Sequence, residues 1–412
     1  MHTLKHQYEE AIKPENIKEA IIEAARHKHK RRDVQNVLEH IDKEVERVRS
    51  MLLDHSYMPT PYNPHIVRDG SKNKERSISK PKYRYDQIMA HVVVQRIKPM
   101  ILKSLYFHVY GSIEGRGQTQ FKKAVERCIR NDPKGTKYCG QGDVKGFYPS
   151  IDQSVLHDKL ARKINDSEFM IEVDKFVYHA PDGGILLGDP TSVWYGHFYL
   201  SDMDHFITGL PEVDHYFRLM DDFVIFGSNK KKLHKAMNLI RSYMYEILHL
   251  RLKFNWQVFR LDYIDKDGEH KGRFLDIDGY RFYRDRTTMR KSVMIHATRK
   301  AERISKRERP NIHDARQMSS HLARLKTCDC YNVFQKRIKG KVNPKQLRRI
   351  ISYHDRKEHQ NELERNRGIS AGEAFGDRHG VVTDNDLSPE EHRGSPEHGC
   401  GGQENGGNAL EI

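Results

Sequence analysis

The chain has 412 residues, with 72 Lys+Arg against 57 Asp+Glu and a net charge of +15. Residues 369–412 hold nine acidic and two basic residues, a net −7, which leaves +22 on residues 1–368. A body this basic favours a polyanionic partner, most often nucleic acid. No apolar run approaches the ~20 residues of a membrane span, and the N-terminus lacks the apolar core of a signal peptide. Five cysteines, with no second pair at zinc spacing, exclude a disulfide framework and predict reduced thiols in the cytoplasm.

The predicted elements alternate between helices with apolar residues at steps of three and four and short apolar strands. In chain order they are helix within 15–54, hairpin arms 65–70 and 74–79, helices 86–105 and 119–130, a strand within 137–148, helix within 152–178, a helix from the Gly/Pro turn at 181–190 to about 207, a hairpin over 214–226, a helix over 233–247, strands 252–260 and 274–284, and basic helices over 299–356. This order has an antiparallel centre and no βαβαβ series, so it predicts the α+β class and disfavours a Rossmann sheet.

The last part of the chain differs in composition from the rest. Beyond about Gly368 it is acidic and rich in glycine, and no apolar periodicity remains. Such a composition cannot bury a core, so we predict a disordered tail over residues 361–412.

The most informative pattern is a set of aspartates at strand ends. Asp221 and Asp222 stand where two apolar strands must turn, although a tight hairpin favours Asn or Gly there. Adjacent like charges destabilise a fold unless a cation neutralises them, yet by itself an exposed acidic turn would explain the pair. A third aspartate, Asp143, ends another predicted strand and favours a cation site over an exposed acidic turn. Three such carboxylates can hold two Mg²⁺ ions about 4 Å apart and leave positions for substrate phosphates.

Six short blocks follow one another along roughly residues 35–360. They are 74–81 with Asp86, 110–119, 143–152, 184–192, 219–222 and 274–282. In this order, and with both aspartate sites present, the chain resembles reverse transcriptases of the bacterial and phage type, related to the enzymes of group II introns and diversity-generating retroelements. Each block alone is a weak or moderate signal, whereas six in order are specific.

The resemblance implies a right-hand polymerase fold with fingers, a palm that carries a small antiparallel sheet, and a helical thumb. The expected domains are an N-terminal helical extension (1–60), fingers (61–136), palm (137–290, with fingers-side helices at 152–180), helical thumb (291–360) and the acidic tail (361–412). In this scheme the basic thumb helices grip the template–primer backbone through phosphate contacts.

The resemblance also implies catalytic residues by matched position. Asp143, Asp221 and Asp222 would be the catalytic carboxylates and metal ligands, with the Val144 carbonyl as an added ligand. The metal would be Mg²⁺, as two ions, with Mn²⁺ as a substitute.

Substrate contacts follow in the same way. Arg76 would hold the incoming triphosphate, with Lys74 as a second candidate, and Tyr148 matches the bulky gate that excludes a 2′-hydroxyl. The other matched positions are Gly188 in the nucleotide pocket, Met220 at the primer end, and Gly279 and Tyr280 in the primer grip.

Some positions depart from the family pattern. Leu187 stands where many relatives have Gln, and His197 stands where many have Asn. The lysine expected in the strand after Leu252 has no assigned counterpart, because Lys253 is near but Trp256 is the aligned position. None of these departures affects the metal aspartates.

The predicted function is an RNA-directed DNA polymerase that extends a DNA or RNA primer on an RNA template with dNTPs. An RNA-templated RNA polymerase is a second reading, which Tyr148 disfavours. A non-catalytic RNA-binding scaffold is a third, which three retained aspartates disfavour because unpaired buried carboxylates are costly. The biological role stays open between diversity generation with a small accessory RNA-binding protein and phage defence with a cognate non-coding RNA. A cytoplasmic location without a membrane partner is expected.

Overall fold

The computed structural model describes residues 3–69, 74–357 and 360. The described residues up to Arg356 belong to one compact unit. The predicted acidic tail therefore lies outside the described residues, and the predicted domain boundaries remain predictions. None of the described helices combines the length and apolarity that crossing a bilayer requires.

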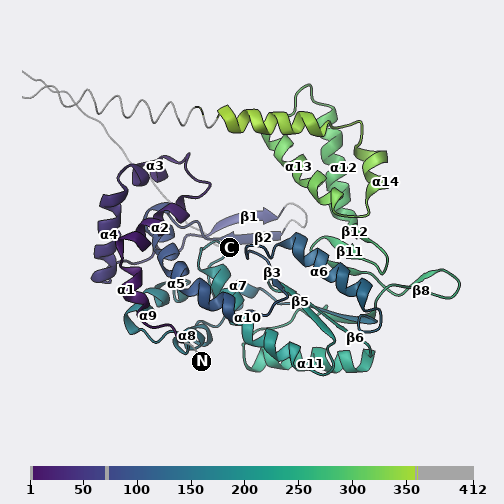
Figure 1. Ribbon diagram of the computed structural model, residues 1–412, viewed down its shortest axis with the longest axis horizontal. Coiled ribbons are helices and arrows are strands. Elements are labelled where there is room, and N and C mark those ends of the chain that lie inside the picture. Colours follow the sequence, from purple (N-terminus) through teal and green to yellow (C-terminus); the bar gives the residue numbers. More distant parts are fainter. Residues whose placement is uncertain (1–2, 70–73, 358–359, 361–412) are drawn as a thin grey trace, which may run out of the picture. The chain divides into compact units, whose positions relative to one another are not determined.

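The N-terminal region is a group of helices packed around one of them, α2 (Figure 1). They are α1 (Gln7–Ala11), α2 (Pro14–Ala25), α3 (Arg32–Glu39), α4 (Ile41–Leu53) and α5 (Ile88–Ser104). The helical pattern predicted over 15–54 is divided into α2, α3 and α4, with breaks at residues 26–31 and at His40. The predicted hairpin also forms, as β1 (His65–Asp69) paired antiparallel with β2 (Lys74–Ile78).

A five-stranded sheet lies at the centre of the compact unit. Its strand order is β3-β5-β6-β4-β7. The bounds are Val109–Tyr110 for β3, Tyr138–Asp143 for β4, His215–Leu219 for β5, Asp222–Gly227 for β6 and Gln257–Arg260 for β7. All neighbours pair antiparallel except β3 and β5, which are parallel. The predicted α+β class with an antiparallel centre is confirmed.

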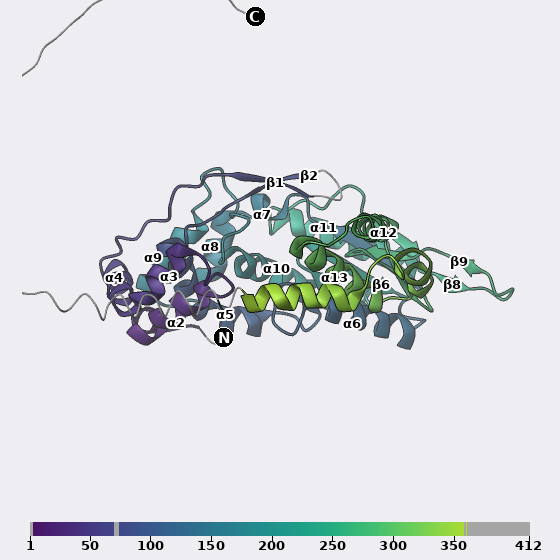
Figure 2. The same cartoon turned by 90° about the horizontal axis from the view of Figure 1, so that it is seen from above.

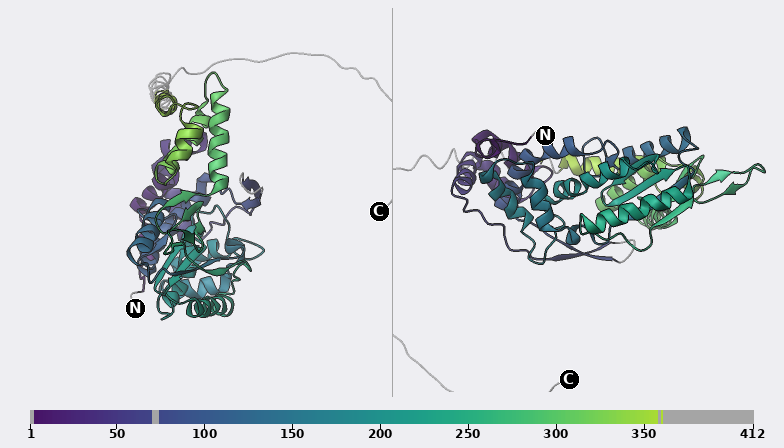
Figure 3. Two further views of the ribbon diagram at one scale, coloured as in Figure 1. Left: turned by 90° about the vertical axis from the view of Figure 1, so that its right-hand side faces the viewer. Right: turned by 90° about the horizontal axis from the view of Figure 1, so that it is seen from below.

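Both faces of this sheet are covered. Helices α10 (Ser192–Thr208) and α11 (Lys230–Glu246) lie against one face, as Figure 3 shows for α11. Helix α6 (Gln118–Asn131) and two later strands, β10 (Leu275–Ile277) and β11 (Tyr280–Phe282), share a second apolar cluster with the opposite face. Alternate residues of β5 divide between the two clusters, since Tyr216 belongs to the first and Phe217 to the second. The sheet is thereby held rigidly on both sides.

The region after the sheet departs from the prediction. The run 274–284, predicted as one strand, is a hairpin of β10 (Leu275–Ile277) and β11 (Tyr280–Phe282), followed by β12 (Thr287–Met289). Its turn residues Asp278 and Gly279 have φ of 52° and 78°, which suits the Asp-Gly turns that join hairpin strands. Two further short strands, β8 (Tyr263–Ile264) and β9 (His270–Lys271), form a hairpin that projects beyond the sheet (Figure 2).

The remaining elements are helical. They are η1 (Tyr83–Gln87), α7 (Phe147–Ser150), α8 (Gln153–Ala161), α9 (Ser167–Val177), α12 (Lys291–Ser305), α13 (Ile312–Lys326), α14 (Tyr331–Val333), η2 (Phe334–Ile338) and the helical residues 344–357. The helices from α12 onward bury an apolar cluster of their own. This agrees with the basic helices predicted for that part of the chain.

Candidate active site

The three predicted aspartates meet at one end of the central sheet. Asp143 is the last residue of β4, and Asp222 is the first residue of β6. The two lie directly opposite each other in the antiparallel register. Asp221 precedes Asp222 in the turn from β5, so three carboxylates share this edge.

The turn that carries Asp221 is strained and firmly held. Leu219 pairs with Asp222, so Met220 and Asp221 form a two-residue turn, and Met220 has a φ of 56°. Such a conformation costs about 1–3 kcal/mol for a residue with a side chain. The Met220 amide donates to the Tyr110 carbonyl at 3.0 Å, and its side chain covers Gly111, where a Cβ would lie 2.8 Å from Met220 Cγ.

A buried ion pair supports this turn from beneath. Arg218 is fully buried and binds both carboxylate oxygens of Asp204, at 2.6 and 2.7 Å. Its remaining Nη1 donates to the Met220 carbonyl at 2.8 Å. Breaking such a pair by removing one partner typically costs 3–5 kcal/mol. Arg218 therefore fixes the position of the turn, a role that the sequence did not reveal.

His197, one of the departures from the family pattern, belongs to the same support. Its Nε2 lies 2.8 Å from the Gly111 carbonyl, and its Nδ1 lies 3.4 Å from Arg218 Nη1. Burial first, and then the neighbouring Arg218 charge, lower the pKa of His197 to about 3, so the ring is neutral and donates from Nε2. The imidazole thus orients the glycine on which Met220 rests.

The carboxylates carry more negative charge than the described residues around them neutralise. Burial, and then the charges of Asp143 and Asp221, raise the pKa of Asp222 to about 7. The pKa of Asp221 is raised for the same reasons. Asp143 Oδ1 is buried without a hydrogen-bond partner among the described residues. Oxygen-rich, negatively charged and incompletely satisfied, this set of donors fits a hard divalent cation such as Mg²⁺.

One ammonium group partly offsets these charges. Lys253 Nζ forms an ion pair with Asp143 Oδ2, and the Lys253 amide donates to the Asp143 carbonyl at 2.9 Å. A β-bridge between Val144 and Leu252 brings the next residue, Lys253, to Asp143. The aligned position, Trp256, instead lies with its ring 5.8 Å from that of His234. The site therefore contains a lysine that alignment alone left unassigned.

Strand β2 and the loop 184–192 bring two predicted positions together. Arg76 in β2 lies close enough to Asp221 to lower the pKa of that carboxyl. The end of β2 is joined to the 184–192 loop, because the Ser79 amide donates to the Leu187 carbonyl at 2.7 Å. Gly188 has a φ of 105°, and a Cβ there would lie 2.4 Å from the Ser79 oxygen, so this close approach requires glycine. Lys74 belongs to the backbone of β2, but its side chain lies outside the described residues.

Tyr148 lies beside the carboxylates. Burial and the charge of Asp221 raise the pKa of Tyr148 to about 12. Its ring centroid lies 5.3 Å from that of Phe147, and a Cβ on Gly196 of α10 would lie 3.6 Å from Tyr148 Cε1. The ring is thus positioned by packing and lies near the Asp221 carboxylate.

The hairpin predicted to hold the primer lies beside the same edge. The Gly279 carbonyl accepts from the Arg290 amide at 2.7 Å, and the Arg324 guanidinium lies 5.6 Å from the centre of the Tyr280 ring. The Asp278 charge contributes to the raised pKa of Asp222, which places a fourth carboxylate near the site. Burial raises the pKa of Asp278 itself to about 6.

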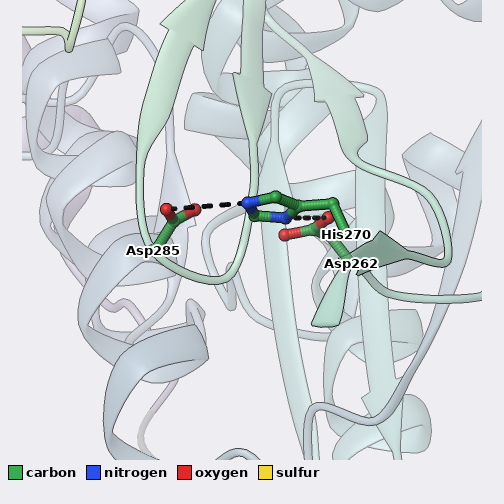
Figure 4. A group of neighbouring side chains, drawn as sticks. All are labelled: Asp262, His270 and Asp285. Carbon is green, nitrogen blue, oxygen red and sulfur yellow. Dashed lines mark hydrogen bonds and ion pairs between the residues drawn. The ribbon is translucent and has the colours of Figure 1, made fainter. Parts of the chain in front are cut away.

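A second acidic group lies at the base of the projecting hairpin. Of the residues that the structure describes, only Asp262, His270 and Asp285 offer three ligand atoms within 4.8 Å of one another (Figure 4). Their polar atoms are already engaged. His270 Nδ1 bonds Asp262 at 3.0 Å, and Arg286 Nη1 reaches both His270 Nε2, at 3.1 Å, and Asp285, at 3.0 Å. The Arg286 cation thus contacts the ligand atoms that a metal ion would otherwise bind.

Comparisons with known proteins give a distant relationship. No family model matches the chain. It is 23% identical over 180 residues to the group II intron-encoded protein LtrA of Lactococcus lactis subsp. cremoris and to its counterpart from strain MG1363. Each match covers 41% of this chain and 29% of the relative, so the chain matches less than a third of the length of these curated proteins.

The chain is reverse-transcriptase-like. Two solved structures are also similar to it, each at 12% sequence identity. Apo telomerase from Candida tropicalis gives a TM-score of 0.45 over 64% of this chain and 51% of that one. Telomerase from Candida albicans, in complex with a fragment of telomeric RNA, gives 0.41 over 69% and 55%. For this reverse-transcriptase-like chain, the roles of individual residues follow from the predicted motifs and remain predictions.

Proposed function

We propose that the protein is an RNA-directed DNA polymerase that extends a primer on an RNA template by two-metal-ion nucleotidyl transfer. The observation that carries the proposal is the meeting of Asp143, Asp221 and Asp222 at one sheet edge, where the described residues supply more carboxylates than cations. Bound Mg²⁺ ions would activate the primer 3′-hydroxyl and stabilise the leaving pyrophosphate. The three aspartates and the Val144 carbonyl would hold these ions.

The chain's own residues supply binding and orientation. Arg76, with Lys74 beside it in β2, would bind the triphosphate, and the joined 184–192 loop would shape the pocket around Gly188. Arg218 would hold the Met220–Asp221 turn so that the Asp221 carboxylate stays aligned with Asp143. The Gly279–Tyr280 hairpin would position the primer end.

Two other functions stay open as alternatives. An RNA-templated RNA polymerase needs space for a 2′-hydroxyl, and the position of Tyr148 beside Asp221 disfavours it. A non-catalytic RNA-binding scaffold would have no use for buried carboxylates with raised pKa values, which are costly without a cation. The polymerase reading therefore has the stronger support.

The system in which this activity works is a narrower proposal. We infer a cytoplasmic prokaryotic or phage retroelement or an anti-phage system, with a cognate non-coding RNA or a small accessory RNA-binding protein as partner. Sequencing the cDNA bound to the purified protein separates these roles. A repeat-derived cDNA indicates diversification, whereas a copy of one structured RNA indicates defence.

The activity itself is tested by primer extension. The purified protein should add dNTPs to a primer annealed to RNA in the presence of Mg²⁺. Asp143→Asn, Asp221→Asn and Asp222→Asn should each lower the rate by about a thousandfold or more, since each removes several kcal/mol of transition-state stabilisation. Asp285→Asn is the matched control from the second acidic group. Wild-type rates in all three aspartate variants would refute the assignment.

A further inference from the structure

A pocket lies on the α6 side of the central sheet. Its volume is about 480 Å³, and α6, the residues around β3 and the first half of β5 line it. The lining residues from β5 are His215 and Phe217, whereas the Met220–Asp221 turn follows the other end of that strand. The pocket is therefore separate from the candidate active site.

Aromatic rings form one wall of this pocket. The ring centroids of His108 and Phe217 are 4.6 Å apart, and those of Phe107 and His108 are 4.9 Å apart. Tyr110 stacks with His108, and its hydroxyl lies 3.0 Å from His108 Nδ1. Phe107 is 68% exposed, and the Arg116 guanidinium carbon lies 5.7 Å from the centre of its ring. Flat rings on which a base can stack are the usual means of binding unpaired nucleotides.

Two basic residues lie on α6, the helix that borders the aromatic wall. Lys123 and Arg127 are one turn apart on α6, and both are exposed. The amides of Gln120 and Asn131 lie on the same helical face and line the pocket, beside the Asp132–His215 pair at 2.8 Å. The pocket thus combines a stacking wall, groups that can hydrogen-bond to base edges, and two positive charges.

These three features together point to one class of ligand. A peptide segment or a small apolar molecule would use the rings but would have no need for two exposed cations on a strongly basic chain. A nucleobase with its phosphate uses all three features, because stacking tolerates any base and Lys or Arg pair with phosphate. Scattered exposed residues are ordinary, but their convergence on one pocket is not.

We propose that this pocket binds an unstacked nucleobase and its phosphate, with Phe107 as the stacking platform and Lys123 and Arg127 as the phosphate contacts. The favoured source is a single-stranded RNA segment held apart from the catalytic edge. A free nucleotide has the same chemistry, and the experiment below distinguishes the two. The proposal does not depend on polymerase activity, so it can be tested in an Asp222→Asn background.

The first test uses a hexanucleotide RNA that contains one 2-aminopurine, whose fluorescence falls when the base stacks. Phe107→Ala should raise its Kd about tenfold and reduce the quenching, since stacking on one aromatic is worth about 1–3 kcal/mol. Phe107→Trp should restore both. Tyr178→Ala is the matched control, because that residue, which follows the end of α9, is 48% exposed and lies near aspartates. A Kd for Phe107→Ala within twofold of wild type would overturn the proposal, as would an equal loss in Tyr178→Ala.

The second test measures the phosphate contacts and the source of the base. Lys123→Gln and Arg127→Gln should each reduce the slope of log K against log salt by about 0.7. Unchanged slopes in both variants would contradict the assigned contacts. Displacement of the hexanucleotide by AMP or UMP from wild type identifies a free nucleotide as the ligand. A lack of displacement, together with the loss of binding in Phe107→Ala, identifies the RNA strand.

Discussion

The two acidic groups of this molecule differ in how their charges are compensated. At the sheet edge, the cations that the described residues bring to Asp143, Asp221 and Asp222 are Lys253 and Arg76, and a buried oxygen of Asp143 has no hydrogen-bond partner among them. In the other group, Asp262 accepts hydrogen bonds from the Arg284 amide, at 2.9 Å, and from His270 Nδ1. Arg286 Nη1 contacts His270 Nε2 and the Asp285 carboxylate. Both groups contain residue types that bind metals.

The difference shows that proximity of ligand atoms does not by itself identify a metal site. The ligand atoms of Asp262, His270 and Asp285 lie within 4.8 Å of one another, but protein cations and amides already satisfy them. The group at the sheet edge is not compact in this sense, yet its carboxyl pKa values are raised by burial and mutual repulsion. Perturbed carboxylates with excess negative charge are typical of functional sites. We therefore expect function at the sheet edge and only stability at the hairpin.

The largest expected effect is an opposite response of activity and stability in the two groups. Asp222→Asn should lower dNTP incorporation by about a thousandfold, because it removes metal charge. Its melting temperature should be unchanged or higher, because a buried repulsive charge is gone. Asp262→Ala should instead cost about 1–3 kcal/mol of stability through lost hydrogen bonds, with activity retained. Primer extension and thermal unfolding of both variants check this, and a lower melting temperature in Asp222→Asn would contradict the comparison.

A metal titration sharpens the same comparison. Mg²⁺ should stabilise the wild-type protein by about 1 kcal/mol when the free ion is at roughly five times its Kd. Asp222→Asn should lose this stabilisation, and Asp285→Asn should keep it. Thermal unfolding with and without EDTA gives the measurement. Loss of the Mg²⁺ effect in Asp285→Asn alone would place the ion at the projecting hairpin.

Sugar selectivity gives an effect at the sheet edge that is smaller than the loss of activity in Asp222→Asn. Tyr148→Val should raise the use of rNTPs relative to dNTPs by at least about tenfold, roughly 1.4 kcal/mol, because the missing ring leaves space for a 2′-hydroxyl. Single-nucleotide incorporation of dATP and ATP on one RNA template is the measurement. If Tyr148 served only to pack against Phe147 and Gly196, both rates would fall together and their ratio would stay fixed.

The sequence predicted the elements that build the sheet edge because their signals are local. Apolar alternation on both sides of Asp221 and Asp222 identified the hairpin, and the strand end at Asp143 followed from its apolar strand. The hairpin at Asp278 and Gly279 carried an equally local signal, the Asp-Gly turn, and treating 274–284 as one strand was wrong.

The missed residues depend on contacts between distant parts of the chain. Lys253 reaches Asp143 across 110 positions, and no local pattern fixes that register. Arg218 is an arginine inside an apolar strand, which sequence alone would place at an exposed position. Its partner Asp204 lies on α10, so the buried pair becomes visible only when the helix packs on the sheet. Tertiary contacts of this kind override local preference.

The smallest expected effect concerns a third titratable group, in which protein contacts again satisfy the charge. His55 Nδ1 lies 2.7 Å from Glu172 and Nε2 lies 2.8 Å from Glu168, and these bonds raise the pKa of His55. Lys175 donates to the His55 carbonyl at 3.0 Å, and the Tyr8 ring stacks on the imidazole at 5.4 Å. This group should therefore affect stability and leave catalysis unchanged.

The sign of its pH dependence follows from the raised pKa. The stabilisation from protonated His55 is fully present below the ordinary histidine pKa, about 6.5, and is lost as the pH rises through the higher folded-state pKa. His55→Gln should thus cost about 1 kcal/mol near pH 5.5, a small value because solvent screens the partly exposed ion pairs between His55 and the two glutamates. The cost should be lower near pH 8.5, where His55 has lost its proton. Urea unfolding of both proteins across this range measures the difference. A gap that grows with pH would mean that His55 is neutral in the folded protein, and a loss of primer extension would give this group a role at the active site.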